Sequence, residues 1–328
     1  MSDIVSCLFD SLETSTYNMH KKLKKENWNN MEEKKVFSDT DLLAREYEKP
    51  VFITDQELRD EVLTEQEKEA LDKFKENNED LCKGRSEVFI MLFIWARKLD
   101  LERSAELLRN HMALREKHDL DNINMEWVKE NLSSKMTVSP QLAGVDSVDK
   151  LGRCVGFILP INMTKLPPEY LKDKTLFVKK MIQVSWWVLE NIFFQKKFIG
   201  HFREGVVYVE DFKDVSLMKM MGVADQSLMK EMMGSMQDAL PLRIRQICLT
   251  NFPLWLRVLV AIAKPFMKKK LRNKIQVLAS REEIRNVIED KHLLKELGGE
   301  LEVDVNHWID HSGLFDQVGK QEALPPKD

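Results

Sequence analysis

The chain has 328 residues, of which 43% are hydrophobic and 32% are charged, and its net charge is −4. This composition is typical of a globular, helix-rich protein with one large core, and the slight acidity argues against generic nucleic-acid binding. With only 12 glycines and 10 prolines, the sequence has few breaks in regular structure.

The sequence predicts a cytoplasmic protein whose membrane contact is peripheral and transient. The apolar run 4–9 does not resemble a signal peptide, because Ser6 interrupts it and Asp10 follows it. No uninterrupted run of 18 apolar residues occurs. The cysteines lack the paired spacing of a C-x-x-C motif, which indicates a reducing compartment; they are Cys7, Cys82, Cys154 and Cys248.

The N-terminal part divides into a polar extension and a helical domain. Residues 1–55 carry mixed charges and no apolar periodicity, so we expect a solvated extension. Thr64 and Glu67 then have the spacing of a capping box, and helical periodicity follows as far as Lys117. Asp100 is expected to end one helix and cap the next. These signals predict a small all-helical domain over residues 56–130.

After Pro140 the pattern changes to short apolar runs separated by long helical segments. Four strands are predicted, at residues 154–159, 206–209, 244–249 and 275–278. Helices are predicted from Tyr170 to about Phe198 and from Glu282 to Leu294. Because strands joined by helices of this length run in the same direction, the sequence predicts an α/β domain with a mainly parallel sheet over residues 131–310. Residues 311–328 would form a C-terminal tail.

One segment reverses the overall charge of the chain. No acidic residue lies between Asp238 and Glu282, whereas nine cations lie between Arg243 and Lys274. Inside this stretch, residues 254–263 are apolar on nearly every face but too short for a bilayer, which requires about 20 residues. Such a helix either belongs to the core or covers an apolar cavity and touches a membrane.

Five short motifs occur in the order and spacing of one protein family. They are residues 93–102 (FIWARKLDLE), 240–245 (LPLRIR), 251–253 (NFP), 264–266 (KPF) and 297–301 (LGGEL). The first is similar to the family signature F-L-R-A-R-K-F-D-V. With these motifs the chain resembles the CRAL-TRIO lipid-binding proteins over roughly residues 60–310.

Within that family the chain resembles the branch of the tocopherol-transfer and cellular retinaldehyde-binding proteins. The signs are the paired cations in residues 241–245 and the run Glu210-Asp211-Phe212-Lys213, which is close to the E-N-F-K of the retinaldehyde binder. The phosphatidylinositol-exchange branch matches less well, because Leu242 and Leu271 stand where that branch has a glutamate and a threonine.

The resemblance implies a helical domain followed by an α/β domain whose sheet and helices enclose an apolar lipid cavity, with residues 254–263 as a mobile gate helix. The cavity would hold a hydrophobic ligand such as a retinoid, a tocopherol or another lipid, and no other cofactor. The resemblance also implies an external phosphoinositide-binding cleft formed by Arg243, Arg245, Lys270 and Lys274.

Several residues are candidates for the cavity wall. Glu210 ends an apolar strand, where a carboxylate is unfavourable unless it is paired or protonated. It would either form a salt bridge at the sheet edge or, with Tyr208 from the same strand face, contact the polar end of a ligand. Seven methionines between Met218 and Met236 suit an adaptable apolar wall. The full predicted set is Phe157, Met181, Ser185, Val206, Tyr208, Glu210, Leu217, Met221, Met236, Leu240, Ile247, Leu256 and Val260.

No catalytic motif is apparent, since the sequence lacks G-x-S-x-G, a glycine-rich phosphate loop and H-E-x-x-H. The seven histidines are scattered and predict no metal site. We therefore expect a non-enzymatic carrier that transfers a hydrophobic small molecule or lipid to or between phosphoinositide-containing membranes. Two alternatives are a phosphoinositide-reading adaptor in membrane trafficking, which would recruit an unknown protein through residues 1–55, and a phospholipid exchange protein.

Overall fold

The computed structural model describes residues 50–166, 169, 172–215, 234–235, 237–257, 269–311 and 315. The chain divides into two units, residues 1–45 and 46–328, and every described element belongs to the second. No helix among these described residues is both long enough and apolar enough to span a membrane.

The described part begins with short and medium-length helices. They are α3 (Asp55–Glu57), the π-helical turn η1 (Leu58–Val62), α4 (Glu65–Asn77), α5 (Glu79–Cys82), α6 (Glu87–Ala96), α7 (Leu101–His118) and α8 (Met125–Ser133). The predicted capping box is confirmed, because Thr64 Oγ1 accepts a hydrogen bond from Glu67 N and the Glu67 carboxylate accepts one from Thr64 N. Asp100 caps α7 as expected. Every residue from Glu87 to Trp95 is buried, so α6 is a central core helix.

Five strands form one sheet in the order β1-β2-β3-β4-β5. They are β1 (Thr137–Val138), β2 (Val155–Ile158), β3 (Val206–Asp211), β4 (Ile244–Thr250) and β5 (Ile275–Val277). Strands β2 to β5 run parallel and β1 pairs antiparallel to β2, so the predicted mainly parallel sheet is confirmed. The two residues of β1 are too few to leave a pattern in the sequence.

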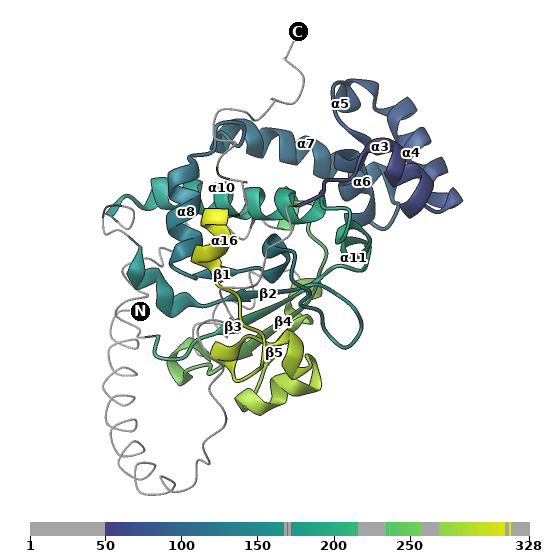
Figure 1. Ribbon diagram of the computed structural model, residues 1–328. Coiled ribbons are helices and arrows are strands. Elements are labelled where there is room, and N and C mark those ends of the chain that lie inside the picture. The colour runs from purple at the N-terminus through teal and green to yellow at the C-terminus, as the bar shows by residue number, and fades with distance from the viewer. Residues whose placement is uncertain are drawn as a thin grey trace, which may run out of the picture. The chain divides into compact units, whose positions relative to one another are not determined.

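The remaining elements cover the sheet and its edges. They are α10 (Lys174–Phe193), α11 (Ile199–Glu204), α15 (Lys269–Arg272), α16 (Val305–His311) and the 3₁₀ helices η2 (Pro140–Ala143), η3 (Pro160–Lys165), η5 (Arg281–Asn286), η6 (Asp290–His292) and η7 (Lys295–Leu297). Figure 1 shows α10 between the sheet and α7. The Gln183 amide joins the two helices by donating to the His118 carbonyl.

Two predicted helices differ from the observed ones. The helix expected to reach Phe198 ends at Phe193, because Phe194 and Lys196 form backbone hydrogen bonds with residues 51–53. The helix expected from Glu282 to Leu294 is replaced by short 3₁₀ turns. The ion pair from Arg281 to Asp211 and the hydrogen bond from Lys150 N to Val287 O hold this segment close to the sheet domain instead.

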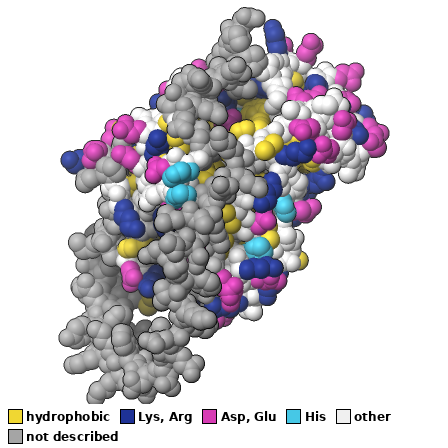
Figure 2. Space-filling view, in the orientation of Figure 1, with side chains coloured by type: hydrophobic (Ala, Val, Ile, Leu, Met, Phe, Trp, Pro, Cys, Tyr) yellow, Lys and Arg dark blue, Asp and Glu magenta, His cyan; other side chains and the backbone are white. Residues whose placement is uncertain are grey.

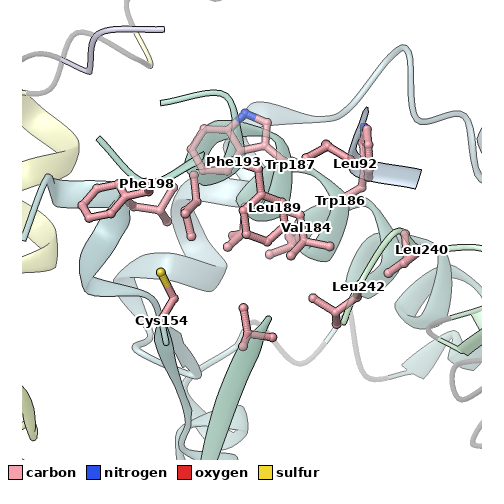
Figure 3. Packing of buried hydrophobic residues seen from close by; sticks show 14 of the residues in the cluster. Leu92, Cys154, Val184, Trp186, Trp187, Leu189, Phe193, Phe198, Leu240 and Leu242 are labelled. Atoms are coloured by element: carbon pink, nitrogen blue, oxygen red, sulfur yellow. The ribbon is translucent and has the colours of Figure 1, made fainter. Parts of the chain in front are cut away.

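One hydrophobic core spans the helical part and the sheet domain. Leu92 of α6, Trp186 of α10 and Leu240 before β4 belong to the same buried cluster (Figure 3). Trp186 and Trp187 point in different directions, as neighbouring helical residues must. Trp186 packs edge-on against Phe89, whereas Trp187 stacks on Phe315.

Gly205 gives a direct test of how β3 is positioned beside β4. Its φ is +88°, and a Cβ atom there would lie 2.3 Å from the Arg243 carbonyl oxygen. We expect Gly205→Ala to lower the free energy of unfolding by about 2–4 kcal/mol, from backbone strain and this collision. Urea denaturation measures the loss.

Gly200→Ala is the matched control, because Gly200 lies in α11 and a Cβ atom added there would meet nothing within 4 Å. It should be neutral or stabilising by up to about 1 kcal/mol. An unchanged Gly205→Ala protein would show that β3 and β4 are not held at this distance.

Candidate functional site

A pocket of about 500 Å³ lies where the helical part meets the sheet domain. Its walls come from the α6–α7 turn, from α7, from the segment that leads into β4, and from residues 270–274. Among the described residues, seven cations and two carboxylates line it, which gives a surplus of five positive charges from these side chains. They are Arg97, Lys98, Arg103, Arg243, Arg245, Lys270 and Lys274, with Glu106 and Asp238.

This surplus is a local feature of the pocket. The helical part carries charges of both signs on the face visible in Figure 2, with acidic and basic side chains intermixed around α4 and α5. The four cations predicted from the sequence as a phosphoinositide cleft all line this one pocket: Arg243, Arg245, Lys270 and Lys274. The structure therefore brings together residues that are up to 31 positions apart.

Three further cations come from the helical part, and sequence analysis did not find them: Arg97, Lys98 and Arg103. They precede the segment without acidic residues by more than 130 positions, so no local pattern links the two regions. The only available signal was the position of Arg97 and Lys98 inside the first family motif, which by itself does not specify a binding role.

Backbone carbonyls orient three pocket cations at the starts of β4 and β5. Arg243 Nη1 donates to the Arg203 carbonyl at 2.5 Å, and Arg245 Nε donates to the Glu204 carbonyl at 2.6 Å. Lys274 Nζ donates to the Ile244 carbonyl. Since a guanidinium has five N–H donors and an ammonium has three, each group retains donors for a ligand.

Side chains of the helical part hold three consecutive carbonyls on the opposite side of the pocket. Arg97 Nη2 donates to the Gln237 carbonyl at 3.3 Å, and Asn110 Nδ2 donates to the Asp238 carbonyl at 3.1 Å. His111 Nδ1 lies 3.1 Å from the Ala239 carbonyl and must carry the proton, because a carbonyl only accepts. Burial and Arg115 lower the pKa of His111 to about 3, so its ring is neutral. We call these three contacts the carbonyl clasp.

The turn that carries Lys98 into the pocket is strained. Lys98 and Leu99 have φ values of 58° and 64°, in the left-handed region. For residues other than glycine this conformation costs about 1–2 kcal/mol each. Strained backbone of this kind persists where the surrounding structure over-determines it, and it is common at binding sites.

The pocket cations destabilise one another. Burial and the neighbouring lysines and arginines lower the pKa of Lys270 and, for the same reasons, bring the pKa of Lys274 to about 8. Burial and Arg245 also lower the pKa of Arg243. A bound anion would relieve this repulsion, so the pocket is electrostatically suited to phosphate or carboxylate groups.

A second polar pair lies on the sheet, away from this pocket. Tyr208 and Glu210 are two residues apart on β3 and therefore point to the same face. Burial raises the pKa of Glu210 to about 7, and burial together with Glu210 raises the pKa of Tyr208. No group in the described part of the chain forms a hydrogen bond with the Glu210 carboxyl. Both residues are only half-buried, so each borders open space.

The other predicted cavity residues fall into three groups. Val206 lies two residues before Tyr208 on β3 and therefore points to the same face as Tyr208 and Glu210. Ile247 of β4 is the residue that pairs with Tyr208. Ile247 and Leu256 pack around one smaller cluster that includes Phe252. Met181 and Ser185 are half-buried on α10, and Leu240 is buried in the main core. Leu217, Met221, Met236 and Val260 lie outside the described residues.

Phe157, which the sequence analysis placed in the cavity wall, does not share the face of Tyr208 and Glu210. It pairs with Val209, so the two-residue period of the strands directs it to the other side of the sheet. There it is fully buried in the core. Gly156 occupies the Tyr208 face instead, and a Cβ there would lie 3.0 Å from Tyr208 Cε1.

Part of this chain is similar to known proteins. The family model described as the CRAL/TRIO domain matches residues 139–299. The chain therefore contains a CRAL-TRIO domain over these residues. A CRAL-TRIO domain-containing protein of Dictyostelium discoideum is 27% identical over 242 residues, which cover 74% of this chain and 89% of that protein.

Similar proteins also include a tocopherol-transfer-like relative and one solved structure. The human alpha-tocopherol transfer protein-like protein is 27% identical over 206 residues, which cover 62% of this chain and 55% of that relative. The chain thus spans about half the length of this relative. The crystal structure of Sfh5 overlays with a TM-score of 0.49 at 14% identity, covering 77% of this chain and 98% of that one.

The raised pKa of Glu210 predicts a pH-dependent stability. A carboxyl that titrates near 7 in the folded state and near 4.5 when unfolded stabilises the fold at low pH, and this contribution is lost as pH rises from about 4.5 to 7. We expect Glu210→Gln to be more stable than the wild type above pH 7, by up to roughly 3 kcal/mol.

Urea denaturation of both proteins from pH 4.5 to 8.5 measures this difference. Glu190, whose pKa burial also raises to about 7, is present in both proteins and cancels. If the two stability curves run parallel, Glu210 is not protonated in the folded state at neutral pH.

Proposed function

We propose that this CRAL-TRIO protein carries a hydrophobic molecule with a polar end and delivers it to membranes through a phosphoinositide docked in the cationic pocket. The CRAL-TRIO domain supports lipid binding and transfer. The observation that carries the docking proposal is the pocket lined by seven cations from two parts of the chain.

The chemistry of the pocket favours phosphate groups. Guanidinium forks pair bidentately with phosphate oxygens, and the pocket offers four arginines: Arg97, Arg103, Arg243 and Arg245. A surplus of five positive charges exceeds what a single phosphodiester would balance and suits a head group with additional phosphates. A volume of about 500 Å³ is within the range of small-molecule sites, so a phosphorylated inositol ring is of suitable size.

The Tyr208–Glu210 pair supports a cargo with a polar end. A carboxyl with a pKa of about 7 is partly protonated at neutral pH, so Glu210 can donate to an aldehyde or carboxylate oxygen or accept from a hydroxyl. Apolar residues of the same sheet face, such as Ile247, would bury the hydrocarbon part at about 25 cal/mol per Å². Retinoids and tocopherols both have this chemistry.

Docking and release would be coupled by differential binding. A membrane phosphoinositide favours release only if it binds the open state more tightly than the closed state. The pocket and the proposed cargo face lie on adjacent segments, since β4 carries both Arg245 and Ile247. This proximity gives a short physical route between the two sites.

A matched pair of lysines tests the docking proposal. Lys270 lines the pocket and its neighbour Lys269 does not, although both are exposed on α15. Since one cation near an anionic surface contributes about 1 kcal/mol, Lys270→Gln should weaken binding to phosphoinositide vesicles about fivefold, and Lys269→Gln should weaken it less. Vesicle co-sedimentation measures both.

The double variant Arg243→Gln/Arg245→Gln should bind phosphoinositide vesicles about 30-fold more weakly, because two cations are removed. It should still bind cargo in solution as the wild type does. An equal loss of cargo binding would contradict the separation of the two sites. Vesicle binding by a protein that takes up no retinoid, tocopherol or phospholipid would indicate the adaptor function instead.

The lowered pKa of Lys274 gives a second test. Its ammonium loses its proton as pH rises through about 8, whereas phosphate monoesters, with a pKa near 6, are already fully ionised. Head-group affinity should therefore fall about fivefold between pH 7 and 9. Lys274→Arg should abolish this fall; an equal fall in that variant would assign the pH dependence to another group.

A further inference from the structure

We propose that Glu106 makes the cationic pocket selective for a phosphorylated polyol over a polyphosphate of equal charge, by accepting a hydrogen bond from a ligand hydroxyl. This inference rests on the proposed function of the pocket as an anion site, and it assigns a role to a residue that opposes anion binding.

Asp238 and Glu106 raise the pKa of Arg97 against the larger effect of burial, whereas neither acts on the pKa of Arg243, Lys270 or Lys274. The two carboxylates therefore lie nearer to Arg97 than to those three cations. Glu106 is on α7, one turn before Asn110, and Asn110 holds the Asp238 carbonyl at 3.1 Å. Glu106 and Asp238 therefore line the side where α7 meets residues 237–239. The cations of the other side include Arg243 and Lys274, and Lys274 is bonded to the backbone of β4. A ligand that fills the pocket therefore meets carboxylate acceptors next to Arg97 and Arg103, and further cationic donors at the segments of β4 and β5.

The Glu106 carboxylate is available to a ligand. Within the described part of the chain it forms no hydrogen bond and no ion pair within 4 Å, although Arg103 is one turn away on the same helix. Its charge nevertheless acts in the pocket, because it raises the pKa of Arg97 against the stronger lowering effect of burial. Arg97 itself is partly engaged by the Gln237 carbonyl.

The chemistry of an ionised carboxylate then determines which ligand fits. It has only acceptors, so it repels a phosphate oxygen and binds a hydroxyl. A ring that carries both phosphates and free hydroxyls can satisfy both sides of the pocket at once. A linear polyphosphate of similar charge has no hydroxyl to donate to Glu106, and the Glu106 carboxylate repels its oxygens. The pocket therefore discriminates against the polyphosphate by a missing hydrogen bond and by charge repulsion.

Isothermal titration calorimetry of the full chain with inositol 1,4,5-trisphosphate and with tripolyphosphate tests this inference. The wild type should prefer the inositol ligand. In Glu106→Gln, tripolyphosphate should bind several-fold tighter because the repulsion is removed, and the preference should fall by about tenfold. Glu106→Asp should retain most of the preference.

Glu102→Gln is the control, because Glu102 is exposed one turn earlier on α7 and does not line the pocket. The inference is overturned if the ratio of the two affinities is unchanged in Glu106→Gln, or if Glu102→Gln changes it equally. If the wild type binds neither probe, the pocket is not an anion site and the proposed function fails as well.

Competition distinguishes a membrane head group from a soluble polyol phosphate. If free inositol trisphosphate displaces the protein from phosphoinositide vesicles but not from phosphatidic acid vesicles, the polyol phosphate on the membrane is the ligand. If it binds without displacing the protein from either vesicle, the same selectivity serves a soluble ligand. Equal binding to both vesicle types with no displacement would contradict recognition of hydroxyls.

Discussion

The arrangement of the pocket depends on the carbonyl clasp, by which α6–α7 side chains hold the carbonyls of Gln237, Asp238 and Ala239. The carbonyl of buried Ala239 is withdrawn from water and requires a partner. The partner of each of the three carbonyls comes from a segment more than 120 positions earlier. The clasp fixes the chain immediately before β4 against the helical part. It thereby brings Arg97 and Lys98 into one pocket with Arg243 and Arg245.

The resulting concentration of like charge is unfavourable in the absence of a ligand. Burial, and after it the neighbouring cations, lower the pKa values of Lys270 and Lys274. The left-handed backbone of Lys98 is a separate, steric cost at the same site. The hydrophobic core offsets these unfavourable contributions to folding, because one buried cluster joins α6, α10 and the sheet. Proteins commonly retain such unfavourable features where they bind ligands.

The sequence predicted the features that depend on local signals. Capping at Thr64 and Asp100 and the four parallel strands follow from patterns within short segments. The four cations at the pocket came from the family resemblance, and their role in binding stays a prediction. The sequence did not predict that Arg103 lines the pocket, because this depends on how α7 packs against residues 237–245. The prediction of a helix at 282–294 was wrong for a related reason, because contacts with Asp211 and Lys150 outweigh the helical propensity of this segment.

The central claim is that a docking pocket and a cargo site are separate and can be occupied together. Native mass spectrometry of the purified full chain, first alone and then with a soluble inositol trisphosphate, tests it most directly. The account predicts one hydrophobic adduct, identified in the organic extract, and one head group bound to the same molecule. Coupled release allows the head group to weaken adduct binding by a finite factor. Strictly exclusive binding, in which no molecule carries both ligands at any head-group concentration, or a folded protein that takes up neither, would contradict it.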